Sequence, residues 1–332
     1  MMLYKMMPRE RTTISSALTA TLFTCLLFSP AQYALACATC GCTLSSNAAM
    51  GYTSQPGWQF TLQYDYINQN QLRHGTGTAA TVPIDHELED KTTNQYITAG
   101  LLYAPNSKWN VNLQIPYVIR DHTTYGDYDP AQPLEASGSH SSSLGDIKLI
   151  GSFQGFLPTH NLGAQLGVQF PTGRHGESVS FSSGPMAGEP LDTSLQPGTG
   201  ATDVIVGTYY YQAISQDFDV FGEAQFQSAV TSSDSFRPGN RTTVTFGLRY
   251  EAFPTWIPQL QFNVSHKTHD QGENADVDNT AGTAVYISPG ASVAVTKKTQ
   301  LYGFVQVPVY RNLAGWQLAP RWTASIGLSR MF

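Results

Sequence analysis

The chain has 332 residues, of which 13% are charged and 11% aromatic, and it carries a formal net charge of −6. No run of about eighteen apolar residues follows the N-terminal region, so a protein that crosses a membrane with helices is not expected. No basic patch is present, which argues against nucleic acid as a partner. Glycine, tyrosine and phenylalanine are plentiful, a composition that favours strands with one side facing lipid.

Residues 1–36 read as a secretory signal peptide. A basic segment precedes a short apolar core at 17–28 and an Ala-Leu-Ala cleavage site at 34–36. We therefore expect a cysteine-containing tail over 37–56 and a folded region over 57–332.

The folded region alternates between apolar and polar residues in segments of about ten residues, each long enough to cross a bilayer as a tilted strand. These features predict an all-β fold, a transmembrane antiparallel up-and-down β-barrel of the outer-membrane type with about twelve strands. The expected strands are 57–66, 96–103, 109–120, 146–154, 162–170, 202–213, 218–227, 242–251, 259–267, 284–296, 301–310 and 319–332.

The connections between these strands alternate between long and short. Outer-membrane barrels have long external loops and tight periplasmic turns, so both termini are expected in the periplasm and the barrel in the bacterial outer membrane. Tryptophan and terminal phenylalanine residues would then form aromatic girdles at the two rims. The expected long loops are 68–93, 121–143, 171–200, 231–240 and 268–282.

The last segment, 319–332, alternates strictly and ends on an aromatic residue. We expect it to close the barrel by pairing with 57–66, because closure removes the exposed sheet edges. Gly327 and Phe332 resemble the C-terminal signal that the outer-membrane assembly machinery reads. Arg330 stands where that signal has an apolar residue, and near the chain end it can reach the interface.

The inward-facing positions of the strands collect glutamines, aromatic residues and charges of both signs. This pattern predicts a narrow polar conduit with aromatic contact surfaces; the alternative is a closed barrel whose interior charges pair with one another. The residues predicted to line the lumen are Gln59, Gln63, Asp65, Gln114, Tyr286, Tyr302, Phe304, Gln306 and Tyr310.

The tail carries three thiols, Cys37, Cys40 and Cys42, in a C-x-x-C-x-C pattern. This spacing is typical of a soft site for Cu(I) or Zn(II). Covalent haem is not expected, because Gly41 stands where the attachment motif requires histidine. A disulfide, a lipidated Cys37 and an incidental cluster remain alternatives.

No catalytic site is expected. The histidines fall mostly in the expected loops, where solvated side chains are the ordinary explanation. Ser265 and His266 are adjacent in one strand, so they point to opposite faces and do not form a dyad with each other.

Short motifs lie at the edges of the expected loops: Leu144-Gly145-Asp146-Ile147, Phe170-Pro171-Thr172-Gly173, Gln196-Pro197-Gly198-Thr199-Gly200 with Asp203, and Phe236-Arg237-Pro238-Gly239-Asn240. Their order and placement resemble the outer-membrane protein family named for the meta-pathway of phenol degradation, which is itself similar to the long-chain fatty-acid channels. The resemblance implies an outer-membrane location and passage of small, often aromatic or hydrophobic, compounds. The chain lacks the longer N-terminal plug of the fatty-acid channels.

Together these observations predict an outer-membrane channel for passive uptake or efflux of small solutes, aromatic or hydrophobic ones among them. The alternative is a closed barrel with a binding or structural role, in which the tail binds copper or zinc. The expected partners are outer-membrane lipid, the assembly machinery and a small-molecule solute, without nucleic acid.

Overall fold

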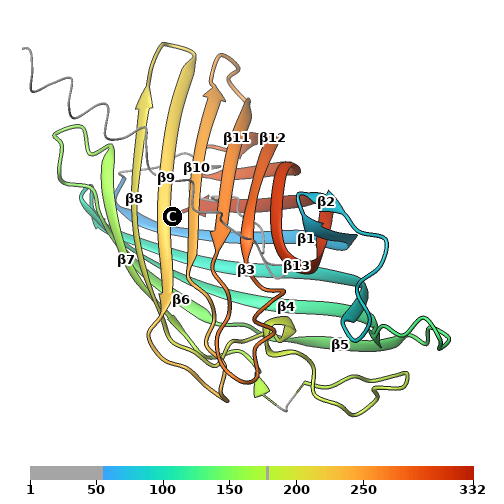
Figure 1. The fold of residues 1–332 in the computed structure, drawn as a ribbon. Helices are drawn as coiled ribbons and strands as arrows, with labels where there is room; N and C mark the ends of the chain where they lie inside the picture. The colour runs from blue at the N-terminus through green and yellow to red at the C-terminus, as the bar shows by residue number, and fades with distance from the viewer. Residues whose placement is uncertain (1–54, 177–178) are drawn as a thin grey trace, which may run out of the picture. The chain divides into compact units, whose positions relative to one another are not determined.

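The computed structural model describes residues 55–176 and 179–332, and these form a closed antiparallel β-barrel (Figure 1). Among them, no helix is long and apolar enough to span a membrane. The predicted all-β barrel is confirmed. Its strands are β1 Gly57–Gly75, β3 Glu87–Asn106, β4 Trp109–Asp127, β6 Ile147–Phe153, β7 Leu162–Phe170, β8 Asp203–Ala213, β9 Phe218–Ala229, β10 Arg241–Tyr250, β11 Trp256–Lys267, β12 Gly282–Thr296 and β13 Thr299–Met331; β2 Gly77–Thr78 and β5 Ser137–Leu144 pair outside this path.

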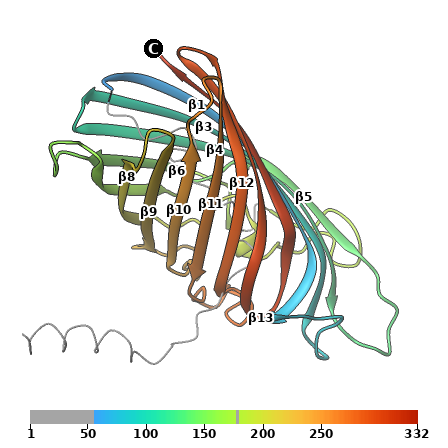
Figure 2. The ribbon, with the colours of Figure 1, turned by 90° about the horizontal axis from the view of Figure 1, so that it is seen from above.

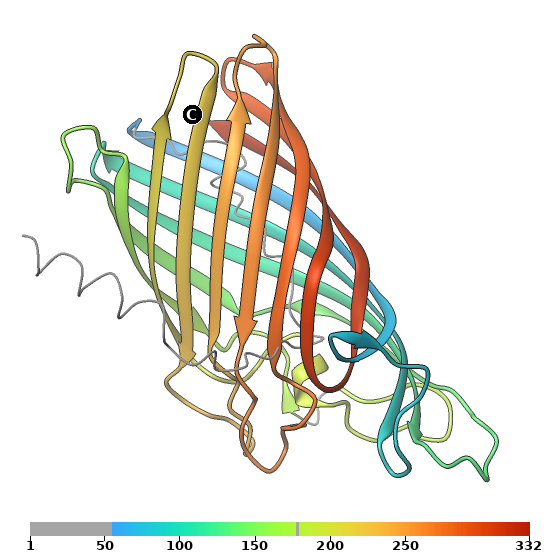
Figure 3. The same cartoon turned by 45° about the horizontal axis from the view of Figure 1, so that its top comes forward.

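The last strand closes the barrel by pairing with the first. The pairs run from Gln59 with Met331 to Gly75 with Leu313, and this confirms the predicted pairing of the two chain ends. Figure 3 shows the result, with the orange and red strands in the near wall and the blue and teal strands behind them. In that view the C-terminus and the short turns lie at the upper end, and the long connections lie at the lower end.

Strand β13 folds back on itself near Gly315, whose φ is +54°. Its first arm is antiparallel to β12 and its second to β1. Successive wall strands alternate in direction from β1 to β12, so β12 and β1 run in opposite directions and one straight strand cannot be antiparallel to both. The amide of Met331 donates to the carbonyl of Lys298 at 2.9 Å, which places the two ends of β13 side by side. Counted over residues 55–176 and 179–332, the wall therefore has twelve crossings, as predicted.

Three strands on one side extend well beyond their predicted ends. β1 continues into the segment expected as the loop 68–93, and β3 begins within it. β4 and β5 likewise occupy much of the expected loop 121–143, where β5 pairs with β4 (Figure 2). The expectation of plain loops there was wrong. Apart from Ile67 and Leu88, the buried side chains of these extensions are polar, Thr92, Asn94 and Thr124 among them, so the apolar alternation is too sparse to reveal the strands.

The outer face of the wall is apolar. Leu166 and Phe246, for example, are 65% and 60% exposed. A continuous apolar band of this kind is a liability in water and is the normal surface of a barrel in lipid. Aromatic pairs flank the band, as expected for girdles: Trp58–Tyr103, Trp109–Phe153 and Phe253–Trp256 near the short turns, and Tyr66–Trp322 and His74–Trp316 toward the long connections.

Candidate channel lumen

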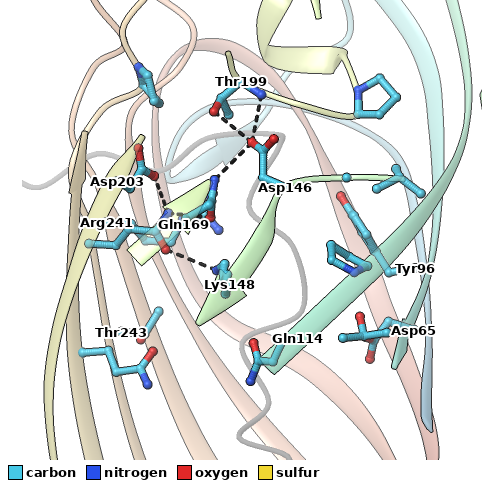
Figure 4. Close-up of a pocket in the computed structure, with 18 of the residues that line it drawn as sticks. Asp65, Tyr96, Gln114, Asp146, Lys148, Gln169, Thr199, Asp203, Arg241 and Thr243 are labelled. Carbon is cyan, nitrogen blue, oxygen red and sulfur yellow. Dashed lines mark hydrogen bonds between the residues drawn. The ribbon is translucent and has the colours of Figure 1, made fainter. Parts of the chain in front are cut away.

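A cavity of about 410 Å³ lies inside the barrel (Figure 4). Its wall comes from inward side chains of β1, β3, β4 and β6 to β11 and from the connections that follow β5, β7, β9 and β11. This volume is in the range of small-molecule sites. Both polar and apolar groups bound the cavity, and Tyr96, Pro116 and Val118 supply apolar surface on the side of β3 and β4.

One segment covers the cavity from the loop side, and we call it the cap loop, residues 179–200. It has a small apolar core of its own, in which Val179, Phe181, Leu191 and Leu195 are buried together. A short 3₁₀ turn, η2 Thr193–Leu195, leads to the residues that face the cavity. The cap loop is thus a folded element and not a slack connection.

The carboxylate of Asp146 holds the cap loop in place. Its Oδ2 accepts from the amide of Thr199 at 3.0 Å and from the Thr199 hydroxyl at 2.9 Å. Its Oδ1 accepts from the amide of Gly173 at 2.9 Å, and Gln169 donates to Oδ2 at 3.2 Å. Figure 4 shows Asp146 projecting from the wall toward Thr199. One side chain therefore ties together the wall, the start of the β7–β8 connection and the cap loop.

Asp146 occupies this position because the wall is interrupted beside it. β5 and β6 follow one another along β4, but the register slips by one residue between the pairs Tyr117–Leu144 and Gln114–Lys148. The amide of Gly145 still bonds the carbonyl of Pro116, at 2.8 Å. This bulge turns Asp146 inward.

Three glycines of the loop-edge motifs, Gly173, Gly198 and Gly239, lie where a side chain would clash with neighbouring backbone. A Cβ on Gly173 would lie 2.6 Å from the Cα of Gly198, and a Cβ on Gly198 would be equally close to Gly173. The two backbones therefore touch where the cap loop meets the wall, and a larger residue at either position would push them apart. Similarly, a Cβ added to Gly239 would lie 2.0 Å from the carbonyl oxygen of Thr268.

Two hydrogen-bonded groups within the cavity bring together charged side chains of opposite sign. Lys267 pairs with Asp270 at 2.6 Å. Lys148 donates to the Oε1 of Gln227 at 3.2 Å, and the amide nitrogen of Gln227 donates to Asp203 (Figure 4). In this part of the lumen, the contacts agree with the alternative stated above, in which the interior charges pair with one another.

The side of the barrel formed by β12 and β13 is filled by aromatic rings that lie over glycines of the neighbouring strand. The ideal Cβ of Gly327 falls 2.2 Å from the ring of Tyr302, and that of Gly290 falls 2.2 Å from Phe304. Phe221 of β9 covers Gly247 of β10 in the same way. A missing side chain on one strand thus makes room for a ring on the next.

The residues predicted to line the lumen divide into two groups. Gln63, Asp65 and Gln114 contribute to the cavity wall. A second group is buried but does not border the cavity: Gln59, Tyr286, Tyr302, Phe304 and Gln306. The two groups are linked, because the Tyr302 hydroxyl donates to Gln63 at 2.6 Å and Gln63 donates to both oxygens of Asp65.

Tyr310 corrects the prediction. It is 47% exposed and pairs with Val285, whereas Pro308 pairs with Tyr286. The bulge between these pairs shifts the parity of β13, so the Tyr310 side chain lies on the outer face instead of the lumen.

The residues of the assembly motif lie at the seam of the barrel. Gly327 lies under the Tyr302 ring, and the amide of Phe332 donates to the carbonyl of Trp58 at 2.9 Å. Arg330 is exposed, with its guanidinium carbon 5.5 Å from the centre of the Phe332 ring.

The predicted metal ligands Cys37, Cys40 and Cys42 lie outside the described residues. Within the part of the chain that the structure describes, no group of three or more histidine, cysteine, aspartate and glutamate side chains is arranged to hold a metal ion.

The sequence reasoning missed Thr199, Gln227 and Arg241 as cavity residues. Arg241 lies one position before the predicted strand, yet it continues the alternation of Thr243 and Thr245, and that continuation was the available signal. Thr199 had no such signal, because its role depends on a wall residue 53 positions away.

The fold and the cavity define a lipid-facing β-barrel with a capped polar lumen. No family model matches the chain, and no curated protein does. Among solved structures, an outer-membrane channel from Pseudomonas putida F1 is similar, with 14% identity over 92% of this chain and 99% of that chain and a TM-score of 0.59. A monoaromatic hydrocarbon channel, CymD, has 10% identity, coverage of 88% and 94% and a TM-score of 0.46. The toluene transporter TbuX of Ralstonia pickettii has 9% identity, coverage of 87% and 94% and a TM-score of 0.44. The first likeness establishes a shared fold; the other two are too weak to bear on function.

Proposed function

We propose that this protein is an outer-membrane channel through which small solutes pass by diffusion. The observation that carries the proposal is the cavity of about 410 Å³ inside a closed barrel whose outer wall is apolar. A barrel filled throughout by side chains would serve only as an anchor, whereas an internal polar space next to a separately folded cap loop serves passage. The similar Pseudomonas putida protein is described as an outer-membrane channel, which agrees with this assignment.

The orientation follows from the connections. The short turns and the C-terminus lie at one end of the barrel, which we assign to the periplasm, and the cap loop lies at the other end, facing outward. The outer-membrane assembly machinery is the expected partner of the C-terminal strand, and lipid is the partner of the wall.

Small solutes with an apolar part suit the cavity. Tyr96, Pro116 and Val118 offer them contact surface, while glutamine and charged side chains keep the remaining wall hydrated. This agrees with the aromatic or hydrophobic compounds that the family resemblance implies.

The test is swelling of liposomes that contain the purified protein in isotonic glycine or arabinose, solutes that cross lipid slowly. Channel function predicts swelling faster than in liposomes without protein, and faster for glycine than for a disaccharide. Identical rates with and without protein would refute the proposal.

The C-x-x-C-x-C tail favours a second, separate role in binding copper or zinc. Metal content of protein purified under reducing conditions, compared with a Cys40→Ser variant, tests this role. Equally low metal in both proteins would remove it.

A further inference from the structure

The cations of the cavity wall differ in what they bind. Arg120 donates to the Tyr96 hydroxyl at 2.9 Å, to Asn94 and to the Gln196 carbonyl of the cap loop, so its guanidinium is occupied. Lys267 is 4% exposed and is held by both oxygens of Asp270. These two side chains act within the protein and leave no strong donor for a solute.

Arg241 is different. It borders the cavity, and among the described residues no hydrogen bond or ion pair engages its guanidinium, although the charge of Asp203 acts on it from within the same cavity. Lys148 is close enough for its charge to interact with that of Arg241. Lys148 donates a hydrogen bond to Gln227, which pairs with Arg241 between β9 and β10. Figure 4 shows Arg241, Lys148 and Asp203 around one part of the cavity.

The carboxylates of the wall do not offer a matching free site for cations. Asp65 accepts from Ser325 at 2.6 Å and from Gln63, and Asp146 is bound by the cap loop. Asp203 accepts from Gln227 through Oδ2, and its Oδ1, which has no hydrogen-bond partner in the described part of the chain, is buried out of reach of a solute. Glu223 accepts from Gln225 at 3.1 Å. The strongest hydrogen-bonding group left for a solute is therefore a donor with positive charge.

We propose that Arg241, with Lys148 beside it, forms a subsite for the carboxylate of a small organic acid. The inference rests on the proposed channel function and names the class of solute. A guanidinium binds a carboxylate through two parallel hydrogen bonds, which suits a free Arg241. Asp203 acts electrostatically on both Arg241 and Lys148, and Asp146 acts on Lys148, so the site favours a single negative charge over a phosphate dianion.

The opposite wall defines the rest of the solute. Tyr96 lies across the cavity from Arg241 in Figure 4, and Pro116 and Val118 border the same side. A molecule with a carboxylate at one end and a ring or short alkyl group at the other places each part against a matching surface.

Equilibrium binding to the full-length protein in detergent tests the subsite, with phenylacetate, 2-phenylethanol and 2-phenylethylamine as probes of one size and three charges. Phenylacetate is expected to bind most tightly. Arg241→Gln is expected to weaken phenylacetate about tenfold or more while leaving 2-phenylethanol unchanged, and Arg241→Lys to fall between. Lys298→Gln, in an exposed short turn, is the matched control and should bind as the wild type does.

Equal phenylacetate affinity in wild type and Arg241→Gln, or tighter binding of 2-phenylethylamine than of phenylacetate, would overturn the subsite. Heat-modifiable gel mobility confirms that each variant retains its barrel. The liposome assay tests channel function separately, because a protein that does not conduct gives no swelling. The two proposals are therefore refuted by different measurements.

Discussion

The carboxylate of Asp146 accepts hydrogen bonds from both the amide and the hydroxyl of Thr199, at 3.0 and 2.9 Å. This relationship joins the barrel wall to the cap loop across 53 positions of sequence. A passage beneath the cap loop therefore depends on a few side-chain contacts that single substitutions can break.

Asp146→Asn is expected to loosen the cap loop without unfolding the barrel. The amide group retains one acceptor oxygen, so some contacts to Gly173 and Thr199 are lost, and hydrogen bonds to charged groups contribute about 1.5–3 kcal/mol each. Chymotrypsin should then cleave faster after Phe181, which is 5% exposed in the anchored loop. Asp90→Asn, at an exposed position of β3, is the control; equal cleavage in all three proteins would argue against the anchor.

Gly247→Ala is expected to destabilise the barrel by about 1–3 kcal/mol, because the new methyl group would lie 1.9 Å from the ring of Phe221. Gly151→Ala is the matched control, since its methyl would meet nothing nearer than the Leu166 carbonyl at 3.7 Å. The measurement is the urea midpoint of barrels refolded in detergent. Equal midpoints would show that the ring over Gly247 moves aside at no cost.

The folded cap loop is expected to be more stable against opening at low pH. Burial raises the pKa of the Asp192 carboxyl above its ordinary value, and the charge of Asp276 adds to the shift; burial likewise raises the pKa of Asp276. The folded loop then binds protons that the opened loop releases, so its stability falls as pH rises from the ordinary carboxyl pKa through the raised one.

Hydrogen exchange of the Leu191 and Leu195 amides, corrected for intrinsic rates, measures this dependence, because both amides bond within the cap loop. Protection should increase as pH is lowered from 7 to about 4.5, and Asp192→Asn should reduce the increase. Protection that rises with pH instead would contradict the assignment.

Phe332→Ala is expected to impair assembly more than Arg330→Ala. Phe332 ends the seam strand and its amide bonds Trp58, whereas Arg330 is exposed near the chain end and reaches the interface at little cost. Levels of folded protein in the outer membrane, measured by heat-modifiable mobility, distinguish the two. Equal levels would argue against the C-terminal signal.

The closure of the barrel was predictable because both seam strands carry an apolar face. Leu62 pairs with Leu328 across the seam, and both lie in a plain alternation. The extensions of β1, β3 and β4 gave no such signal, since most of their buried side chains are polar. Tyr310 was misplaced because one bulge in β13 inverts parity, and a bulge is set by pairing partners that the sequence does not display.

The candidate site was predictable only in part. Gln63, Asp65 and Gln114 followed from strand parity, which is a local property. The anchor between Asp146 and Thr199, and the position of Arg241 beside Lys148, depend on which strands become neighbours and on how a long connection folds. Such contacts between distant positions have no periodic signature.

The most direct test of a capped passage is the single-channel current across a planar bilayer, compared between wild type and Asp146→Asn. We expect small, brief openings for the wild type and larger or longer ones for the variant, whose cap loop is less firmly held. If both folded proteins give no current above that of detergent alone, the lumen does not conduct and the central claim is wrong.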